Sequence, residues 1–411
     1  MHSFIALLLS LHILLYSALS CIPFSFTQYL STPPITATQE NTNVPPNDTA
    51  ESTGVQITAP SAVLMEASTG TIIYEKDSHA VRHPASITKI MTLNLIFEAI
   101  ENGKISMTDT VTVSEHAAGM GGSQVFLEAG ETQTVETMIK CISIASANDA
   151  SVAMAEFVSG SEAAFVAEMN EKAKELGMKD TTFVNCCGLD TEGHMTSAYD
   201  IALMSRELSV NHPQIHDYCT IWMDTITHNT AKGSSEFGLT NTNKLIRQYP
   251  YATGLKTGST GLAKFCLSAT AKKDGMEMIA VVLGAENPNN RFNDAATLLN
   301  HGFAKCKVYT DENKDALPNI QVKKGKTDTV SLSYKNTFQY LSVDGADLSQ
   351  IKKELHIPKS VDAPLKKGEK VGEATYSLND KKIGTVDIIL ASDISKAKFM
   401  DYLQEILQSY F

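Results

Sequence analysis

The sequence predicts an α/β (α+β) protein in which one sheet is completed by both ends of a large domain. Strand-like runs open the segment 59–305 and return after residue 251, helical periodicity fills the stretch between them, and a helix ends the segment. After residue 307 short alternating runs are separated by turns containing lysine and glycine, which predicts a separate small β domain. At 411 residues the chain is long enough for two or more domains.

The elements of the large domain follow from local patterns. Residues 59–77 form two β-like runs around a Ser-Thr-Gly turn, which predicts a hairpin. An apolar helix follows and ends at Gly103, a favourable C-terminal cap. Further helices are expected within 134–178 and at 196–210, and strands at 265–285, before a closing helix at 289–305. Both ends of this domain therefore supply strands.

The N-terminus has the composition of an export signal. An apolar run over residues 4–16 precedes Ala18 and Ser20, which fit the minus-three and minus-one positions of a cleavage site before Cys21. The usual basic residues before the run are missing, so a retained membrane anchor and a lipid-modified Cys21 are the alternatives. We predict a signal peptide over 1–20 and an exported, extracytoplasmic protein.

Between the signal and the folded part, residues 21–55 are rich in Thr, Pro and Asn and poor in large apolar residues. Such a segment cannot bury enough surface to order itself, so we predict a flexible tether. The net charge of −12 argues against a nucleic-acid partner, which normally meets a basic face.

The last twenty residues, 392–411, are predicted to form an amphipathic helix. Phe399, Leu403, Ile406 and Tyr410 lie on one stripe, and the segment is too short and too charged to span a bilayer. Two interpretations are open. The stripe packs on the preceding β domain, or it lies in a membrane surface.

Ser86 and Lys89 pose the functional question, because they lie one turn apart where an apolar helix begins, in "HPASITKIMT". A buried lysine is costly unless something requires it. Taken alone, a capping serine and a lysine that reaches solvent would explain the pair. Two further motifs argue against that explanation: "SAND" at 146–149 and "LKTGSTG", which contains Lys-Thr-Gly at 256–258. The order S-x-x-K, S-x-N, K-T-G is the signature of penicillin-recognising serine acyl-enzymes.

With these motifs the chain resembles the D-alanyl-D-alanine carboxypeptidases, the low-molecular-mass penicillin-binding proteins. The blocks that carry the resemblance are "HPASITKIMT", "SANDA", "FVNCCGLD", "HMTSAYDIALMS" and "GLKTGSTGLAKFCLSATAKKDG". It covers about residue 56 to the C-terminus and implies an antiparallel sheet with helices on both sides. It also implies a catalytic domain at 56–307, a small β-rich domain at 308–391 and attachment of the terminal helix to the outer face of the cell membrane.

The family chemistry implies a role for each motif residue. Ser86 would be the nucleophile, and Lys89, if burial lowers its pKa, would take the serine proton. Ser146 would pass a proton to the leaving amine, and Asn148 would hydrogen-bond the peptide group of the substrate. The substrate would be a peptidoglycan stem peptide, and β-lactams would be covalent inhibitors.

The third motif is expected to bind the substrate's C-terminus. Lys256 would supply positive charge near Ser146 and the terminal carboxylate, which Thr257 would hydrogen-bond. Gly258 would let the peptide lie along the strand as an added β-strand. The backbone N–H groups of Ser86 and Ser259 would hold the oxyanion. Arg291 matches a family arginine, and either carboxylate recognition or a surface salt bridge would explain it.

Several positions depart from the family pattern. Cys186-Cys187 stands where the family often has Pro-His, and Lys264 lies where it could alter the rim of the site. His194 lacks a carboxylate partner in the sequence pattern, which favours a structural role over a general base. Asp149 is expected to stabilise a helix rather than to react.

Six cysteines follow Cys21, mostly in apolar contexts, and they are expected to be free thiols. They lack zinc-ligand spacing, and we expect neither a metal nor an organic cofactor. The six are Cys141, Cys186, Cys187, Cys219, Cys266 and Cys306.

Two other functions compete with carboxypeptidase activity. A class A β-lactamase shares the three motifs, but it needs a glutamate in an E-x-x-L-N loop that this chain lacks, and it has no second domain. A non-catalytic cell-wall binding protein would have lost reacting residues, and all of them are present here. The sequence therefore favours a serine-type D-Ala-D-Ala carboxypeptidase.

Overall fold

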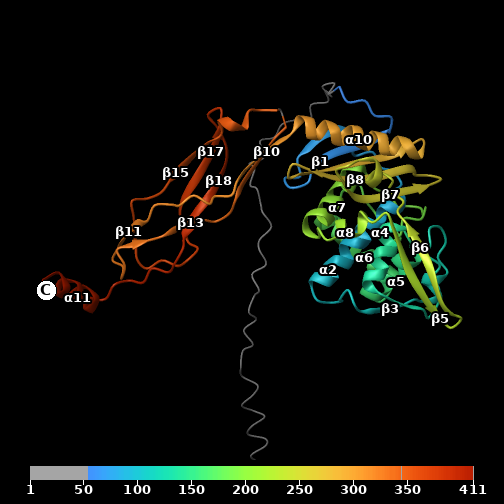
Figure 1. The fold of residues 1–411 in the computed structure, drawn as a ribbon, viewed down its shortest axis with the longest axis horizontal. Helices are drawn as coiled ribbons and strands as arrows, with labels where there is room; N and C mark the ends of the chain where they lie inside the picture. The colour runs from blue at the N-terminus through green and yellow to red at the C-terminus, as the bar shows by residue number, and fades with distance from the viewer. Residues whose placement is uncertain (1–53, 344, 411) are drawn as a thin grey trace, which may run out of the picture. The chain divides into compact units, whose positions relative to one another are not determined.

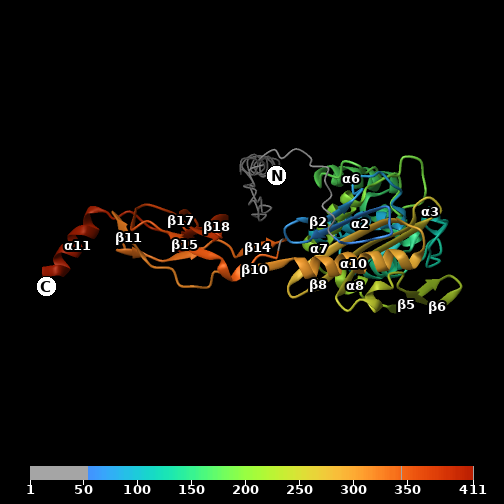
Figure 2. The same ribbon diagram turned by 90° about the horizontal axis from the view of Figure 1, so that it is seen from above.

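The computed structural model describes residues 54–343 and 345–410. The predicted signal peptide and nearly all of the predicted tether lie outside these residues. Figure 1 and Figure 2 show the course of the chain in two views.

A five-stranded antiparallel sheet forms the frame of the large domain, in the order β2-β1-β9-β8-β7. Its strands are β1 Ser61–Glu66, β2 Ile72–Lys76, β7 Ala252–Thr260, β8 Lys264–Lys273 and β9 Met276–Ala285. Because β1 pairs with β9, the two ends of the domain meet within one sheet, which confirms the expected fold class. The strand β7 pairs only with β8 and is an edge of this sheet.

The sheet has an apolar core on each face. Along β1, Val63 and Met65 belong to one buried cluster while Ala62 and Leu64 belong to the other, as the two-residue period of a strand requires. The helix α10, Pro288–Lys305, packs on one face, and α7, Ala198–Asn211, packs on the opposite face together with α2 (Figure 1). Helices therefore cover both sides of the sheet, as expected.

The segment between β2 and β7 is mainly helical. Its elements are η1 Ala85–Thr88, α2 Lys89–Glu101, β3 Thr110–Thr112, α3 Glu115–Ala118, β4 Thr132–Thr134, α4 Val135–Ile144, α5 Asn148–Ser159, α6 Glu162–Glu175, α8 Ile215–Cys219, β5 Met223–Thr230, β6 Gly233–Thr240 and α9 Leu245–Gln248. Ser197 caps α7 through its side chain, and Gly103 has φ +68 just after the end of α2. Both features agree with the sequence.

Two features of this segment were not predicted. The helical stretch breaks at Ser146, which has φ +62, so the S-x-N motif occupies a turn between α4 and α5. The hairpin β5–β6 projects at the periphery of the domain (Figure 1, Figure 2). Most of its residues are at least partly exposed, so its strands lack the apolar alternation that identifies a half-buried strand.

The C-terminal part is rich in β structure, as expected, and contains two small apolar clusters. Its elements are β10 Lys307–Asp311, β11 Ile320–Lys323, β12 Thr329–Val330, β13 Leu332–Tyr334, β14 Phe338–Ser342, η2 Leu348–Gln350, β15 Lys352–His356, β16 Ser360–Asp362, β17 Lys370–Leu378, β18 Lys381–Leu390 and α11 Phe399–Tyr410.

The terminal helix is shorter than predicted. It begins at Phe399 rather than at 392, because the backbone just before it is used in isolated β-bridges: Ile394 pairs with Leu365, and Lys396 pairs with Gly325. Among the described residues, no helix is both long and apolar enough to cross a membrane.

Candidate active site

Ser86 and Lys89 meet at the junction of η1 and α2. Lys89 is fully buried, and its Nζ lies 3.1 Å from Ser86 Oγ, 2.6 Å from Asn148 Oδ1 and 2.7 Å from the carbonyl oxygen of Cys187. Asn148 Oδ1 and the Cys187 carbonyl oxygen can only accept hydrogen bonds, so each of them takes one N–H group of the Lys89 amine. The third tetrahedral position, an N–H in the ammonium and a lone pair in the neutral amine, therefore points to Ser86.

Burial lowers the pKa of Lys89 to about 8, because the charged form loses its hydration; the Cys187 thiol and Asp149 oppose this shift. With a pKa of about 8, about a tenth of Lys89 is neutral at pH 7, and the neutral amine has a lone pair facing the serine hydroxyl. The buried lysine therefore lies within hydrogen-bond distance of the Ser86 hydroxyl with an orbital directed at it.

The turn before the nucleophile is held in an unusual conformation. Ala85 has φ +49, and its carbonyl accepts a hydrogen bond from Thr88 Oγ1 at 2.9 Å. His194 Nε2 lies 2.8 Å from Thr88 Oγ1, and its Nδ1 accepts from the backbone N–H of Val184 at 2.9 Å. The acceptor role of Nδ1 places the ring proton on Nε2, which donates to Thr88.

Burial lowers the pKa of His194 to about 4, so the imidazole stays neutral. Its two nitrogens are both engaged with the protein. The structural role expected for His194 is thus supported, and that role is to brace the turn that carries the nucleophile.

Ser146 and Lys256 form a second buried pair. Lys256, on β7, donates from Nζ to Ser146 Oγ at 2.8 Å and to the carbonyl oxygen of Thr257 at 3.1 Å. Burial and the charge of Lys89 hold the pKa of Lys256 well below its usual value. Two motifs that are 110 residues apart in the chain are joined by this contact.

Asn148 connects the S-x-N motif to the loop before it. Its Oδ1 accepts from Lys89, its Nδ2 donates to the carbonyl of Gly121 at 2.6 Å, and its backbone N–H donates to the carbonyl of Ser123 at 2.7 Å. Gly122 has φ +84, and a Cβ there would lie 2.8 Å from Asn148 Nδ2, so the close approach requires glycine.

The third motif lies on the edge strand. Thr257 Oγ1 is 2.6 Å from Thr242 Oγ1. A Cβ on Gly258 would lie 2.9 Å from both Ile87 Cγ1 and the carbonyl oxygen of Pro84. The missing side chain therefore lets β7 approach the nucleophile turn, a reason that differs from the expected clearance for substrate. Ser259 is exposed.

Arg291 is nearly buried, which rules out the surface salt bridge that the sequence left open. Its Nη1 donates to the carbonyl oxygens of Gly258 at 3.1 Å and Cys266 at 3.2 Å. These bonds tie the neighbouring strands β7 and β8 together behind the third motif. Lys264, expected near the rim, forms an exposed ion pair with Glu286 at 2.5 Å.

Sequence reasoning missed two contributors in "FVNCCGLD". Cys187 acts through its backbone carbonyl, which no side-chain pattern could reveal. Gly188 has φ +86, and a Cβ there would lie 1.9 Å from the carbonyl oxygen of Ala85. A glycine next to two apolar cysteines was the one available signal for such close backbone packing.

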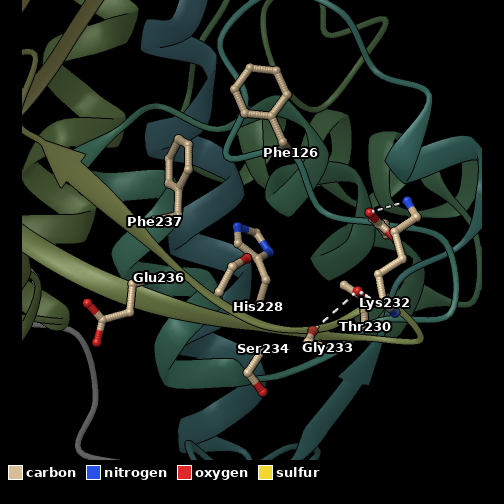
Figure 3. A pocket seen from close by; sticks show the side chains of 10 residues that line it. Phe126, His228, Thr230, Lys232, Gly233, Ser234, Glu236 and Phe237 are labelled. Atoms are coloured by element: carbon tan, nitrogen blue, oxygen red, sulfur yellow. Dashed lines mark hydrogen bonds and ion pairs between the residues drawn. The ribbon is translucent and has the colours of Figure 1, made fainter.

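A hollow of about 380 Å³ lies between the β5–β6 hairpin and the loop that contains Phe126 and Glu128. Figure 3 shows Phe126, His228 and Phe237 around it; the Phe126 and Phe237 rings meet edge to face with centroids 5.8 Å apart. Asp149 is buried and accepts the N–H groups on both sides of Phe126, those of Val125 and Leu127, at 3.1 Å each. Asp149 therefore holds this loop through its carboxylate, whereas the sequence led us to expect that it stabilises a helix.

The six described cysteines after residue 53 are buried and carry free thiols, in agreement with their apolar sequence contexts. A serine paired with a buried lysine, a second serine–lysine pair and an edge strand beside them define a serine hydrolase of the acyl-enzyme type.

Comparison with known proteins identifies the family. The family model described as D-alanyl-D-alanine carboxypeptidase matches residues 46–287, and the model described as the C-terminal domain of penicillin-binding protein 5 matches residues 304–396. The chain belongs to the D-alanyl-D-alanine carboxypeptidase family and is a serine peptidase.

Individual relatives agree with this assignment. D-alanyl-D-alanine carboxypeptidase DacF of Bacillus subtilis (strain 168) is 44% identical over 84% of this chain and 88% of the relative. Penicillin-binding protein 5 from Haemophilus influenzae superposes with a TM-score of 0.68 at 28% identity, over 86% of this chain and 100% of that one. Penicillin-binding protein D2 from Listeria monocytogenes, solved in an ampicillin-bound form, gives a TM-score of 0.53 at 30% identity, over 60% of this chain and 98% of that one.

Proposed function

We propose that the chain removes the terminal D-alanine from peptidoglycan stem pentapeptides through an acyl-enzyme on Ser86. The observation that carries this proposal is the position of Lys89. Its hydrogen bonds to Asn148 Oδ1 and the Cys187 carbonyl leave the third position on Nζ, the lone pair of the neutral amine, directed at Ser86 Oγ. Neutral Lys89 takes the hydroxyl proton as the oxygen attacks the carbonyl of the penultimate D-alanine. The N–H groups of Ser86 and Ser259 stabilise the oxyanion.

The second serine–lysine pair serves the leaving group. As the tetrahedral intermediate collapses, the C–N bond breaks and Ser146 passes a proton to the departing amine, with Lys256 supplying positive charge beside it. Lys256 and Thr257 bind the carboxylate of the leaving D-alanine, and Asn148 binds the peptide group. Water then releases the shortened peptide from Ser86.

A β-lactam would acylate the same serine, because its ring amide presents a carbonyl where the peptide bond lies. Deacylation should be slow, since the chain lacks the E-x-x-L-N glutamate with which class A β-lactamases activate water. The ampicillin-bound relative supports this part of the proposal.

The test uses the purified full-length chain with a fluorescent penicillin and, separately, diacetyl-lysyl-D-alanyl-D-alanine. A slowly decaying label on the Ser86 peptide together with release of D-alanine is the expected result. Rapid turnover of penicillin without release of D-alanine would instead identify a β-lactamase. The absence of both signals would leave only a binding role.

The pH dependence of acylation should follow Lys89. Because the neutral amine is the base and its pKa is about 8, kcat/KM for peptide should rise with pH and level off above that value. Below it, the rate should fall about tenfold per pH unit as Lys89 becomes protonated. Initial rates of D-alanine release between pH 6 and 9 measure this profile. A rate that does not change across that range would contradict Lys89 as the base.

We further propose an exported enzyme with a signal peptide at 1–20, a tether at 21–55, a catalytic domain at 56–307 and a small domain at 308–391. The C-terminal helix would attach it to the outer face of the membrane. Support comes from α11, where Phe399 is 79% exposed, Met400 is 67% exposed and Leu407 is 52% exposed. Such side chains would be covered by the headgroup region of a lipid bilayer.

Changing Leu403 and Leu407 together to glutamate should weaken binding of the full-length chain to phosphatidylethanolamine–phosphatidylglycerol vesicles by about tenfold or more, because two apolar side chains lose their burial. Co-sedimentation measures this. Leu355→Glu, at an exposed leucine on β15, is the matched control and should bind like the unaltered chain. Equal binding by both variants would contradict attachment through the helix.

A further inference from the structure

We propose that Cys186 and Cys187 form an oxidation-sensitive modification site, at which a peroxide links the two adjacent sulfurs and thereby stops acylation of Ser86. This inference rests on the proposed function, because its effect is transmitted through Lys89.

The backbone of this dipeptide is bonded to the catalytic helix at two points. The carbonyl of Cys187 accepts from Lys89 Nζ at 2.7 Å, and the carbonyl of Cys186 accepts from Thr92 Oγ1 at 2.6 Å. Lys89 and Thr92 are three residues apart and lie on the same side of α2. Rotation of the Cys186–Cys187 peptide therefore moves the acceptor of Thr92, and any accompanying turn of the Cys187–Gly188 peptide withdraws an acceptor from the catalytic lysine.

The two thiols are chemically unlike each other. A hydrogen bond between them raises the pKa of Cys186 and lowers that of Cys187 to about 7, and the positive charge of Lys89 also lowers the pKa of Cys187. Burial also opposes the ionisation of Cys187, but there the hydrogen bond outweighs it, whereas at the other described cysteines burial is the largest effect. It raises the pKa of Cys219 to about 12 and those of Cys266 and Cys306 to about 11.

Cys187 is consequently the thiol that is most readily ionised among the described cysteines, and the thiolate is the form that attacks an oxidant. Both side chains are almost fully buried, so a small oxidant is required. Hydrogen peroxide is close to water in size. The partly exposed Ser86 is the solvent-facing end of the chain of contacts that runs through Lys89 Nζ to the Cys187 carbonyl.

The chemistry needs only the peroxide. The Cys187 thiolate attacks one peroxide oxygen, the O–O bond breaks and hydroxide leaves, which gives a sulfenic acid. Cys186 loses its proton and attacks the Cys187 sulfur, the S–O bond breaks and water leaves. Overall, two thiols lose two electrons and two protons, and hydrogen peroxide is reduced to two molecules of water.

The resulting ring cannot keep the present backbone. Adjacent Cα atoms across a trans peptide are about 3.8 Å apart, whereas disulfide-linked Cα atoms are usually about 4.4–6.8 Å apart. Because a trans peptide fixes the Cα–Cα distance, the ring closes only by rotation about the bonds that flank the 186–187 peptide, and this rotation reorients the backbone of both residues. The neighbouring backbone leaves little space for this movement. Gly188 packs so closely against the Ala85 carbonyl that a Cβ at Gly188 would lie 1.9 Å from that oxygen.

The test begins with the reduced full-length chain, which is first labelled with fluorescent penicillin. If the reduced chain does not acylate Ser86, the proposed function fails. If it does, hydrogen peroxide is added to a second sample, and the acylation rate is measured before and after treatment with dithiothreitol. The peptide containing residues 186 and 187 is analysed by mass spectrometry for the loss of two hydrogen atoms.

The expected result is a drop in the acylation rate of more than tenfold, in proportion to the fraction of chain with the 186–187 disulfide, and recovery with dithiothreitol. Each variant is compared with its own untreated rate. Cys186→Ser should form no such disulfide, and Cys306→Ser, the matched control, should be as sensitive as the unaltered chain. Two outcomes would overturn the inference alone: peroxide leaves the two thiols unlinked, or the linked chain still acylates at the reduced rate.

Discussion

Ser86→Ala is expected to abolish covalent labelling by penicillin and to lower kcat for D-alanine release by about four orders of magnitude or more. The reason is the position of Ser86 Oγ, the hydroxyl oxygen 3.1 Å from Lys89 Nζ. Without it, Lys89 has no nucleophile to activate, and no covalent intermediate forms. Gel fluorescence after incubation with labelled penicillin and a D-alanine release assay measure the two effects.

The loss should be chemical rather than structural. Ser86 is partly exposed, and its hydroxyl forms a hydrogen bond with Lys89 Nζ. Removing one partly exposed hydrogen bond costs little stability, so the unfolding midpoint of Ser86→Ala should stay close to that of the unaltered chain. Ser331→Ala, at an exposed serine of the small domain, should keep full labelling. If Ser86→Ala still traps penicillin at another residue, the assignment of the nucleophile is wrong.

Gly188→Ala is expected to lower the free energy of unfolding by about 2–5 kcal/mol, from overpacking and a left-handed backbone combined. Its φ is +86, and the added Cβ would lie 1.9 Å from the Ala85 carbonyl oxygen and 2.9 Å from the Ser86 nitrogen. These are backbone atoms of the nucleophile turn and cannot rotate away as a side chain would. Acylation should therefore slow together with the loss of stability.

Gly193→Ala separates the two causes. Gly193 has φ +81, nearly the same as Gly188, but its nearest atom to an added Cβ is Val184 Cγ2 at 4.0 Å. For Gly193→Ala the free energy of unfolding should fall by only about 1–2 kcal/mol, the cost of a left-handed backbone at alanine, and penicillin labelling should be normal. Urea unfolding and acylation rates of the two variants measure the comparison. Equal losses in both would show that the contact with Ala85 is unimportant.

The two buried lysines have different roles in the proposed reaction: Lys89 is the base for Ser86, and Lys256 binds the leaving group. Their hydrogen-bond partners differ accordingly. Lys89 faces two oxygen acceptors and the nucleophile, whereas Lys256 faces Ser146 and a carbonyl of its own strand. Burial first, and then the positive charge of Lys89, lower the pKa of Lys256. A substrate carboxylate beside Lys256 would offset its charge, which suits a peptide with a free C-terminus.

The sequence by itself determined the features that depend on short spacings. The three-residue separation of Ser86 and Lys89 places both on one side of a helical turn whatever surrounds them. The β-like runs at 59–77 and 265–285, with the turn residues between them, predicted strands at both ends of the large domain. The order of the three motifs then indicated an acyl-enzyme.

Tertiary structure alone decided which atoms meet. Lys256 reaches Ser146 across 110 residues, and Lys89 reaches the Cys187 carbonyl across 98. A backbone carbonyl is the same in every residue, so its use at the site leaves no mark on the side-chain pattern. The burial of Arg291 and the close packing at Gly188 and Gly258 likewise depend on elements distant in sequence, because steric contact is set by the packing of strands and turns against one another.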